Sequence, residues 1–286
     1  MKIFLMGAYG MLGHKLIQRL KREHDIYGTC KEIHSGPPWS SVIDADRLIA
    51  GIHAEKMETV ALAMSKSKPD VVINCIGIVK QVEAATDPIV SIYTNSLFPH
   101  LLARECFIND AKLIHFSTDC VFSGKKGMYS LSDPSDAEDL YGRTKFLGEV
   151  GGKESLTIRS SLIGRELGTR NGLVEWFLAQ RGKSVKGYRN AIFTGFTTLE
   201  MSNIVSMILK KHEDLSGVWH IAANPISKYD LLSLVNRGMD LGIQIEPDDS
   251  IKCDRSLDGS AFSSKTGYMP PSWNDMIKEM IKDSNL

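Results

Sequence analysis

The sequence predicts an α/β fold, a doubly wound parallel sheet with a smaller C-terminal lobe. Two observations predict it: short β-rich runs alternate with amphipathic stretches through about the first 160 residues, and these runs are apolar nearly throughout. A strand that is apolar on both sides is covered on both faces, as in a parallel sheet. Strands that alternate with helices are joined by right-handed crossovers, so we expect helices on both faces of the sheet.

The predicted elements follow one another in a regular order. We expect strands at residues 3–6, 26–30, 71–75, 113–117 and 156–160. The amphipathic stretches between them predict helices at residues 11–21, 55–67, 89–106 and 140–151. Further along the chain we expect a short strand at 218–222 and helices at 172–179, 200–211, 229–239 and 273–281.

The alternation becomes less regular after about residue 163, where short β-like pieces separate the helical patterns. We expect a larger domain at 1–163 and a smaller substrate-binding lobe at 164–286, with the two interleaved along the chain. No Pro/Gly/Ser-rich linker, low-complexity tract or internal repeat divides them. In this interpretation the two share one packed unit.

The composition excludes several classes of protein. The 286 residues include 34 Lys and Arg against 34 Asp and Glu, so the formal charge is zero. Binding to nucleic acid or to an anionic membrane surface usually needs a basic excess, so we expect neither partner and only local anion sites. Five scattered cysteines without a C-x-x-C pair disfavour a disulfide framework and a metal site. Without a recognisable signal peptide or spanning segment, we expect a cytoplasmic protein.

A glycine-rich turn follows the first predicted strand. Three glycines there permit a tight turn, close approach of the backbone to a pyrophosphate, and close packing of the helix on the strand. The start of the next helix adds backbone N–H donors and a partial positive charge. Directly after strand one of an α/β chain, the pattern predicts a Rossmann dinucleotide site, the alternative being an ordinary tight turn. The candidate cofactor residues in the turn are Gly7, Tyr9, Gly10, Met11, Leu12 and Gly13.

The end of the second predicted strand indicates which dinucleotide binds. An acidic residue there would bind the adenosine ribose of NAD, but this chain has Thr29 or Cys30 at that point, followed by Lys31. Lys31, with His34, would attract a 2′-phosphate, so we favour NADP(H), while Glu32 keeps NAD(H) open. A solvated surface lysine is the alternative for Lys31. Asp44 is a candidate acceptor for the adenine amino group, or else a surface carboxylate.

Two side chains with acid–base chemistry share one face of the helix predicted at 140–151. Tyr141 and Lys145 are four residues apart, about one turn. A phenol has a pKa of about 10, but a nearby ammonium stabilises its phenolate, so Tyr141 can pass a proton to a carbonyl oxygen. Thr118, at the end of the strand predicted at 113–117, adds a hydroxyl that can polarise the same carbonyl. A Tyr-x-x-x-Lys pair by itself would be an ordinary surface pair.

These motifs all follow predicted strands. The carboxyl ends of the strands in an open α/β sheet form the edge at which ligands bind. We expect four parts of the chain at that edge: the glycine turn, Cys75-Ile76-Gly77, Thr118 and the segment after Ser160.

With these motifs the sequence resembles the extended short-chain dehydrogenase/reductase family, in the branch of dTDP-4-dehydrorhamnose reductase. The matching stretches span nearly the whole chain: GAYGMLG, VVINCIGIV, STDCVFSG, YGRTKFLGE, LTIRSSLIG, DRSLDGSAF and TGYMPPSW. The resemblance implies that Thr118, Tyr141 and Lys145 are catalytic, with Tyr141 as the proton donor. It also implies a nucleotide-activated sugar in the C-terminal lobe, and a cofactor lined by Cys75, Ile76, Gly77, Tyr141 and Lys145.

The sequence departs from that branch at positions that the resemblance places against the sugar. Cys120 stands where an aromatic residue is expected, Leu162 replaces a tryptophan, and Lys80 adds a cation after the third predicted strand. Since the cofactor and catalytic positions are intact, we expect the same chemistry on a different sugar. Four cations, Lys80, Lys186, Arg189 and Arg255, are candidate ligands of a diphosphate, or for Lys80 of a carboxylate, with solvated surface charges as the alternative. The candidate substrate-binding residues are Lys80, Thr118, Asp119, Cys120, Arg189 and Arg255.

We therefore expect an NAD(P)H-dependent reductase of a 4-keto nucleotide sugar, acting in deoxysugar or polysaccharide biosynthesis. One alternative is a nucleotide-sugar epimerase or dehydratase that keeps NAD tightly bound. Another is a non-catalytic NADP-binding regulatory subunit like that of methionine adenosyltransferase. The expected partner is the nucleotide-sugar substrate, and a homodimer is left open.

Overall fold

The computed structural model describes residues 1–80 and 82–283. They form two compact units whose segments alternate along the chain. Unit 1 comprises Met1–Ser117, Asp139–Ile158 and Ser202–Val218, and unit 2 comprises Thr118–Glu138, Arg159–Met201 and the described residues from Trp219 onward. The domain boundary predicted between residues 163 and 164 stays a prediction.

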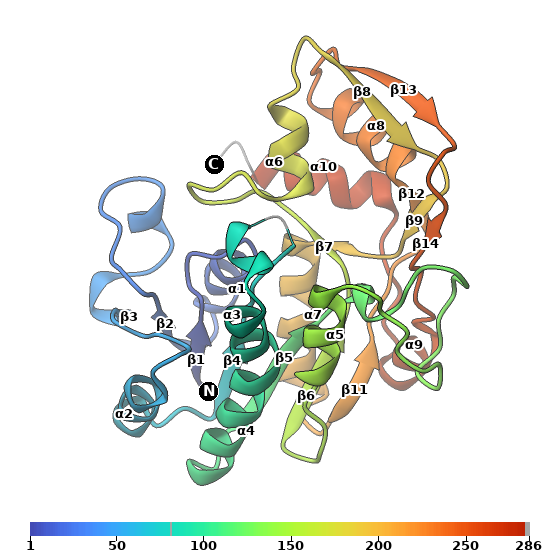
Figure 1. The fold of residues 1–286 in the computed structure, drawn as a ribbon. Helices are drawn as coiled ribbons and strands as arrows, with labels where there is room; N and C mark the ends of the chain where they lie inside the picture. The colour runs from blue at the N-terminus through green and yellow to red at the C-terminus, as the bar shows by residue number, and fades with distance from the viewer. Residues whose placement is uncertain (81, 284–286) are drawn as a thin grey trace. The chain divides into compact units, whose positions relative to one another are not determined.

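A seven-stranded sheet is the main element of unit 1 (Figure 1), with the strand order β11-β6-β5-β4-β1-β2-β3. Strand β1 pairs in parallel with β2 and β4, and β4 pairs in parallel with β5. The bounds are β1 Lys2–Met6, β2 Asp25–Thr29, β3 Leu48–Ile49, β4 Val71–Asn74, β5 Lys112–Ser117, β6 Ser155–Arg159 and β11 Gly217–His220. The predicted doubly wound α/β fold is confirmed, and the ends of the first five predicted strands differ from those observed by no more than one residue.

Strand β1 shows why these strands are apolar throughout. Ile3 and Leu5 alternate along the strand with Phe4 and Met6, and all four side chains are fully buried. Phe4 and Met6 belong to a core cluster that also contains residues of β4, α2 (Met57–Ser67) and α4 (Phe98–Ile108). Both faces of β1 are therefore covered, as the unbroken apolar pattern predicts.

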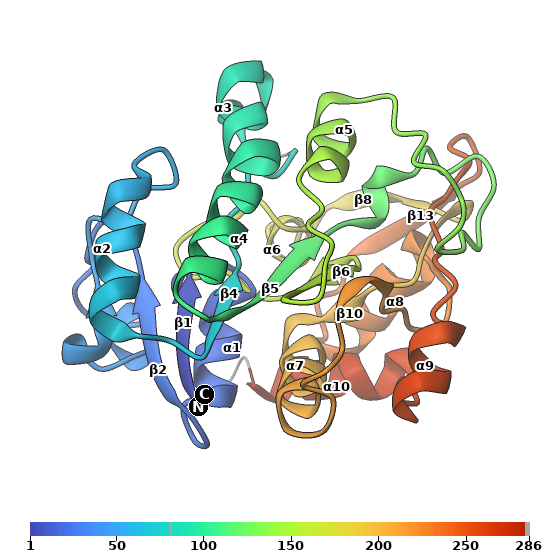
Figure 2. The same cartoon turned by 90° about the horizontal axis from the view of Figure 1, so that it is seen from below.

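Helices cover both faces of the sheet in unit 1 (Figure 2). On one face α1 (Gly13–Leu20) lies beside α7 (Thr198–Lys211), where Arg19 Nε donates to Asn203 Oδ1 at 3.0 Å. On the other face α2 packs against α4, and α5 (Leu140–Leu147) packs beside the segment that precedes α4. Short 3₁₀ turns complete the connections: η1 Trp39–Ser41, η2 Ala45–Arg47 and η3 Glu83–Thr86 in unit 1, and η5 Asp119–Val121 in unit 2.

The helix predicted at 89–106 is instead built of three parts. It consists of α3 (Pro88–Ile92), a π-helical turn η4 (Tyr93–Leu97) and α4. Pro99 lacks the N–H that an α-helix would direct at the carbonyl of Asn95, so the regular ladder is interrupted there. The Asn95 carbonyl is instead approached by Gly148 of the neighbouring helix, where a Cβ would lie 1.9 Å from the Asn95 oxygen. Helix α5 ends at Leu147, with Gly148 as its C-cap, short of the predicted residue 151.

Unit 2 consists of short strands and helices. Strands β8 and β13 pair in parallel, β9 lies between β12 and β14, and β7 pairs with β10. The strands are β7 Leu162–Ile163, β8 Ser184–Tyr188, β9 Ala191–Phe193, β10 Phe196–Thr197, β12 Ile226–Ser227, β13 Gln244–Asp248 and β14 Cys253–Asp254. The helices are α6 Leu173–Leu178, α8 Lys228–Gly238, α9 Ser260–Thr266 and α10 Trp273–Asp283. Helices α6, α8 and α10 lie at three of the predicted positions.

The described residues contain no helix that combines the length and the apolar character needed to cross a bilayer. Among the same residues, His, Cys, Asp and Glu side chains nowhere gather in a group of three that could hold a metal ion.

Candidate active site

The glycine-rich turn joins β1 to α1. Gly7 adopts φ +85°, a backbone conformation that side chains with a Cβ rarely adopt. Gly13 lies so close to the turn that a Cβ would sit 2.0 Å from the Gly7 carbonyl oxygen. Leu12, at the N-cap of α1, makes no side-chain cap, and the first turn of the helix has no acidic side chain. The backbone at the start of α1 is thus arranged as a phosphate site requires, whereas the Leu12 side chain is buried in the core.

A hollow of about 350 Å³ opens beside this turn. Thr29, at the end of β2, lines it and is 1% exposed, and among the described residues its Oγ1 has no hydrogen-bond partner. A buried hydroxyl without a partner normally indicates a missing ligand or water. Asp44 is exposed and does not line this hollow. The lining residues are Gly7, Ala8, Tyr9, Gly10, Thr29, Cys30, Lys31, Glu32 and His34.

Lys31 lies at this hollow with an exposed side chain, and its Nζ is 3.7 Å from Glu55 Oε1. At that separation and exposure the ion pair is weak, so the lysine charge remains accessible to an anion. The His34 ring lies near two aromatic rings, with its centroid 5.4 Å from that of Tyr9 and 5.2 Å from that of Trp39. Sequence reasoning missed Trp39, because nothing local ties it to the glycine turn.

The segment after β4 lies against the same turn. A Cβ on Gly7 would be 3.4 Å from the carbonyl carbon of Cys75, and a Cβ on Gly77 would be 3.9 Å from Lys145 Nζ. Asn95, in the π-helical turn, holds this segment by accepting from the Ile78 N–H at 2.9 Å and donating to the Ile78 carbonyl at 3.0 Å. Within unit 1 the predicted cofactor residues Gly7, Cys75, Gly77 and Lys145 therefore lie together.

Helix α5 carries the predicted acid–base pair. Asp139 caps its N-terminus by accepting from the Gly142 N–H at 2.8 Å, which fixes the turn that contains Tyr141. Lys145 is 6% exposed and donates from Nζ to the Phe116 carbonyl at 2.6 Å. Burial lowers the pKa of Lys145 from 10.5 to about 8. A lysine with a pKa near neutrality can exchange protons under physiological conditions, which suits a role beside a tyrosine acid.

The family of the chain follows from a match over its whole length. The model of the family described as "RmlD substrate binding domain" matches residues 1–286. The chain belongs to this family. The resemblance found in the sequence motifs is thereby confirmed.

Curated relatives and solved structures are similar to the chain, among them the following three. The probable low-salt glycan biosynthesis reductase Agl14 of Haloferax volcanii is 26% identical over 232 residues, 78% of this chain and 75% of the relative. The probable dTDP-4,6-dihydroxy-2-methyloxan-3-one 4-ketoreductase of Streptomyces antibioticus is 25% identical over 260 residues, 84% of this chain and 78% of the relative. The crystal structure of Bacillus anthracis dTDP-4-dehydrorhamnose reductase in complex with NADP superposes with a TM-score of 0.81 at 17% identity, covering 99% of each chain.

Thr118, the first residue of unit 2, is 7% exposed. Its hydroxyl donates to Asp119 Oδ1 at 3.1 Å and accepts from the Cys120 N–H at 3.1 Å. Cys120 is partly buried, and no aromatic ring occupies this position of the family motif. The substrate roles predicted for Thr118, Asp119 and Cys120 stay predictions.

The predicted diphosphate ligands all make contacts within their own unit. In unit 2 Arg189 Nε donates to Asp249 Oδ1 at 2.9 Å, and Arg255 Nε donates to the Phe122 carbonyl at 2.9 Å. In unit 1 Lys80 Nζ lies 2.6 Å from Asp139 Oδ2. These cations would have to exchange or share their partners to bind a substrate, and their substrate roles stay predictions.

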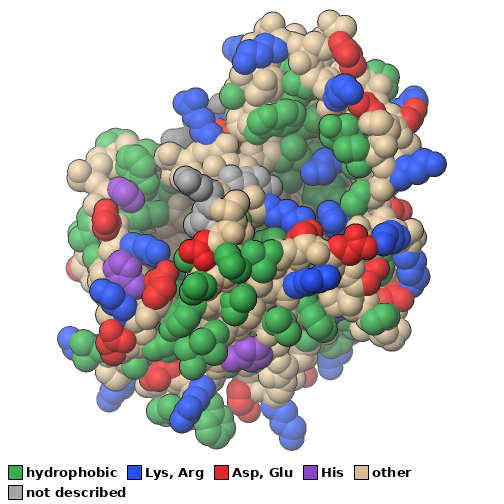
Figure 3. All heavy atoms as spheres, viewed as in Figure 1, with side chains coloured by type: hydrophobic (Ala, Val, Ile, Leu, Met, Phe, Trp, Pro, Cys, Tyr) green, Lys and Arg blue, Asp and Glu red, His purple; other side chains and the backbone are tan. Residues whose placement is uncertain are grey.

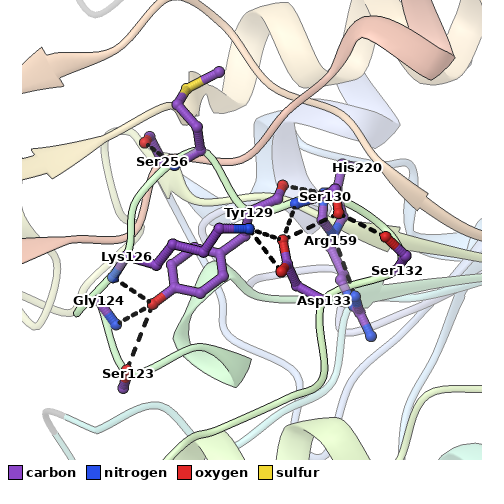
Figure 4. Close-up of polar contacts among 11 residues, drawn as sticks. Ser123, Gly124, Lys126, Tyr129, Ser130, Ser132, Asp133, Arg159, His220 and Ser256 are labelled. Carbon is purple, nitrogen blue, oxygen red and sulfur yellow. Dashed lines mark hydrogen bonds and ion pairs between the residues drawn. The ribbon is translucent and has the colours of Figure 1, made fainter.

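A buried polar network of unit 2 was not predicted from the sequence (Figure 4). The Tyr129 hydroxyl accepts from the Gly124 and Lys126 N–H groups, each at 3.1 Å, and thereby closes the turn between them. The Tyr129 carbonyl lies 3.0 Å from His220 Nδ1, and Arg159 Nη1 lies 3.2 Å from His220 Nε2. Burial, followed by the Arg159 charge, lowers the pKa of His220 to about 4. Neutral His220 thus fixes the loop that follows Thr118, and the only sequence signal was an arginine within an apolar strand.

Proposed function

We propose that the chain is an NAD(P)H-dependent reductase of a 4-keto nucleotide-activated sugar, acting in deoxysugar or polysaccharide biosynthesis. One observation carries the proposal: Lys145, one turn from Tyr141 on α5, is buried beside Gly77, within the cluster of predicted cofactor residues. The family supports it, as do the names of the relatives, which are those of sugar-biosynthesis reductases.

The residues of unit 1 fit a dinucleotide. The glycine turn leaves no room for a Cβ at residue 13, residues of that turn line the hollow beside it, and the buried Thr29 hydroxyl has no partner within the described chain. Lys31 and His34 favour NADP(H) through attraction of a 2′-phosphate, and Glu32 leaves NAD(H) as the second choice. When bound there, the nicotinamide cofactor supplies the hydride that reduces the keto carbon.

The chain's own residues complete the reaction. Tyr141 donates its hydroxyl proton to the keto oxygen, so that the carbonyl becomes an alcohol, and the tyrosinate regains a proton from water. Lys145 stabilises the tyrosinate, and its low pKa reduces the cost of proton exchange. From the family motif we assign Thr118 the role of hydrogen-bond donor to the same oxygen.

A panel of 4-keto nucleotide sugars, followed by the loss of NADPH absorbance, tests the proposal. We expect turnover with at least one sugar, and a Tyr141→Phe variant that lowers kcat by about 100-fold or more while NADPH binding stays within about twofold. Retained turnover in that variant would contradict the assignment of Tyr141. Sugar conversion without net loss of NADPH would favour an epimerase or dehydratase, and cofactor binding without any conversion would favour a regulatory role.

We also propose that the chain forms a homodimer in the cytoplasm. Hydrophobic side chains gather over α3, α4 and α5 (Figure 3), where Ile89, Phe107, Ile108 and Leu147 are 61% to 77% exposed. Such a patch is unusual for a surface that faces only water. We expect Phe107→Asp or Leu147→Asp to lower the molar mass by half in light scattering, whereas Leu62→Asp on α2 leaves it unchanged. A monomeric wild type would contradict the dimer.

A further inference from the structure

Lys80 extends from a segment that is held in place. The backbone of Ile78, two residues before it, is bound on both its N–H and its carbonyl by the Asn95 side chain. The Lys80 side chain therefore starts from a fixed point beside the cofactor residues after β4. It reaches α5, where its Nζ lies 2.6 Å from Asp139 Oδ2.

Asp139 connects Lys80 to the helix that carries Tyr141. Its Oδ1 accepts from the Gly142 N–H, while its Oδ2 meets the lysine. One carboxylate thus both caps α5 and pairs with Lys80, two residues before Tyr141. Both partners are more than one third exposed, so the ion pair itself contributes little to stability.

The same ammonium lies near the Tyr141 phenol, with Nζ 5.9 Å from the ring centroid. In the proposed reduction Tyr141 becomes negatively charged as its proton leaves. The Asp139 carboxylate alone would oppose that charge. The Lys80 ammonium offsets the carboxylate charge and is itself attracted to the Tyr141 ring. Like the positive end of the α5 helix dipole, it stabilises a negative charge on Tyr141.

We propose that Lys80 is a positioning residue for Tyr141: it pairs with Asp139, which caps the first turn of α5, and its charge offsets that carboxylate and favours the tyrosinate that forms during reduction. This role differs from that of a diphosphate ligand, and it rests on the proposed reductase function. A ligand of the diphosphate would act on substrate binding, whereas a residue that acts through Tyr141 affects the chemical step.

Steady-state kinetics of Lys80→Met separate the two roles. With the distance to the charge taken as the 5.9 Å between Lys80 Nζ and the Tyr141 ring centroid, a unit charge at an effective dielectric constant of 40 to 80 corresponds to roughly a three- to tenfold change in rate. We expect kcat to fall by about that factor while KM for the sugar stays within about twofold, and Lys80→Arg to restore most of kcat. An unchanged kcat with a raised KM overturns the proposal in favour of a substrate ligand.

Lys210→Met is the matched control, because Lys210 forms a similar half-exposed ion pair with Glu23 at 2.7 Å in the same unit. We expect it to leave kcat and KM unchanged. An equal loss of kcat in both variants would mean that any lost surface pair slows the enzyme, and would overturn the specific role of Lys80.

A readout without turnover distinguishes failure of this proposal from failure of the reductase function. In protein labelled with ¹³Cζ-tyrosine, with the Tyr141 resonance assigned by Tyr141→Phe, Lys80→Met should shift that resonance at neutral pH and Lys210→Met should not. If no keto sugar is reduced but the resonance shifts, the reductase assignment fails and the placement of Lys80 stands. If the wild type turns over and the resonance does not move, the Lys80 proposal fails alone.

Discussion

Replacement of Lys145 by methionine should abolish turnover and yet stabilise the fold. The shift of its pKa from 10.5 to about 8 corresponds to roughly 3 kcal/mol, at about 1.4 kcal/mol per pH unit, by which the folded protein disfavours the ammonium at neutral pH. Methionine fills a similar volume but forfeits the hydrogen bond to the Phe116 carbonyl, which costs about 1 kcal/mol. The net gain of about 2 kcal/mol corresponds to a melting temperature about 4 °C higher.

The stabilisation should also depend on pH. Because the folded-state pKa of Lys145 lies below the unfolded value, the unfolded chain binds more protons between about pH 8 and 10.5. The free energy of unfolding of the wild type therefore rises with pH across this window, and the advantage of Lys145→Met shrinks. Other titrating groups act equally on both proteins and cancel in the difference.

Thermal unfolding followed by circular dichroism at pH 7 and at pH 10 measures both effects. Lys66→Met, at an exposed position of α2, is the control and should change the melting temperature little at either pH. The reasoning is refuted if Lys145→Met melts below the wild type at pH 7, or if the difference between the two proteins is the same at both pH values.

Three further substitutions test the cofactor site and the unit 2 network. Gly13→Ala should weaken NADPH binding by about tenfold or more in calorimetry, because its Cβ would lie 2.0 Å from the Gly7 oxygen. Gly151→Ala, with open space around it, is the control and should not weaken binding. Equal NADPH affinities of the two variants would exclude the turn as the phosphate site. Lys31→Ala should weaken NADPH binding by about tenfold and NADH binding little, and equal losses would argue against a 2′-phosphate contact. Tyr129→Phe should lower the melting temperature by about 4 °C, because two backbone N–H groups lose their acceptor. An unchanged melting temperature would mean that water replaces the hydroxyl.

The strands, most helices and the glycine turn could be predicted because they depend on local patterns. Residues that are apolar throughout mark a strand covered on both faces, and glycines directly after the first such strand mark a turn with no room for a Cβ. The spacing of Tyr141 and Lys145 likewise placed both on one face of a helix. Each of these inferences needs only residues that are neighbours in the chain.

The parts that could not be predicted depend on residues far apart in the sequence. The π-helical turn reflects the missing N–H of Pro99 together with Gly148, which approaches the Asn95 carbonyl from another helix. No local pattern in the stretch 89–106 contains that neighbour, so the periodicity indicated one continuous helix.

The charges near the candidate site were decided in the same way. The sequence predicts Lys80 as a cation for the substrate, and folding also brings it to Asp139, 59 residues later, and beside Tyr141. Burial, which the sequence does not show for a single lysine, gives Lys145 its low pKa. The sequence by itself determined the fold class and the placement of Tyr141 and Lys145 on one face of a helix, because helical spacing and strand patterns are local. Only the tertiary structure decided the electrostatic surroundings of that pair, because the energy of a charge depends on which groups lie within a few ångströms and on how much water remains.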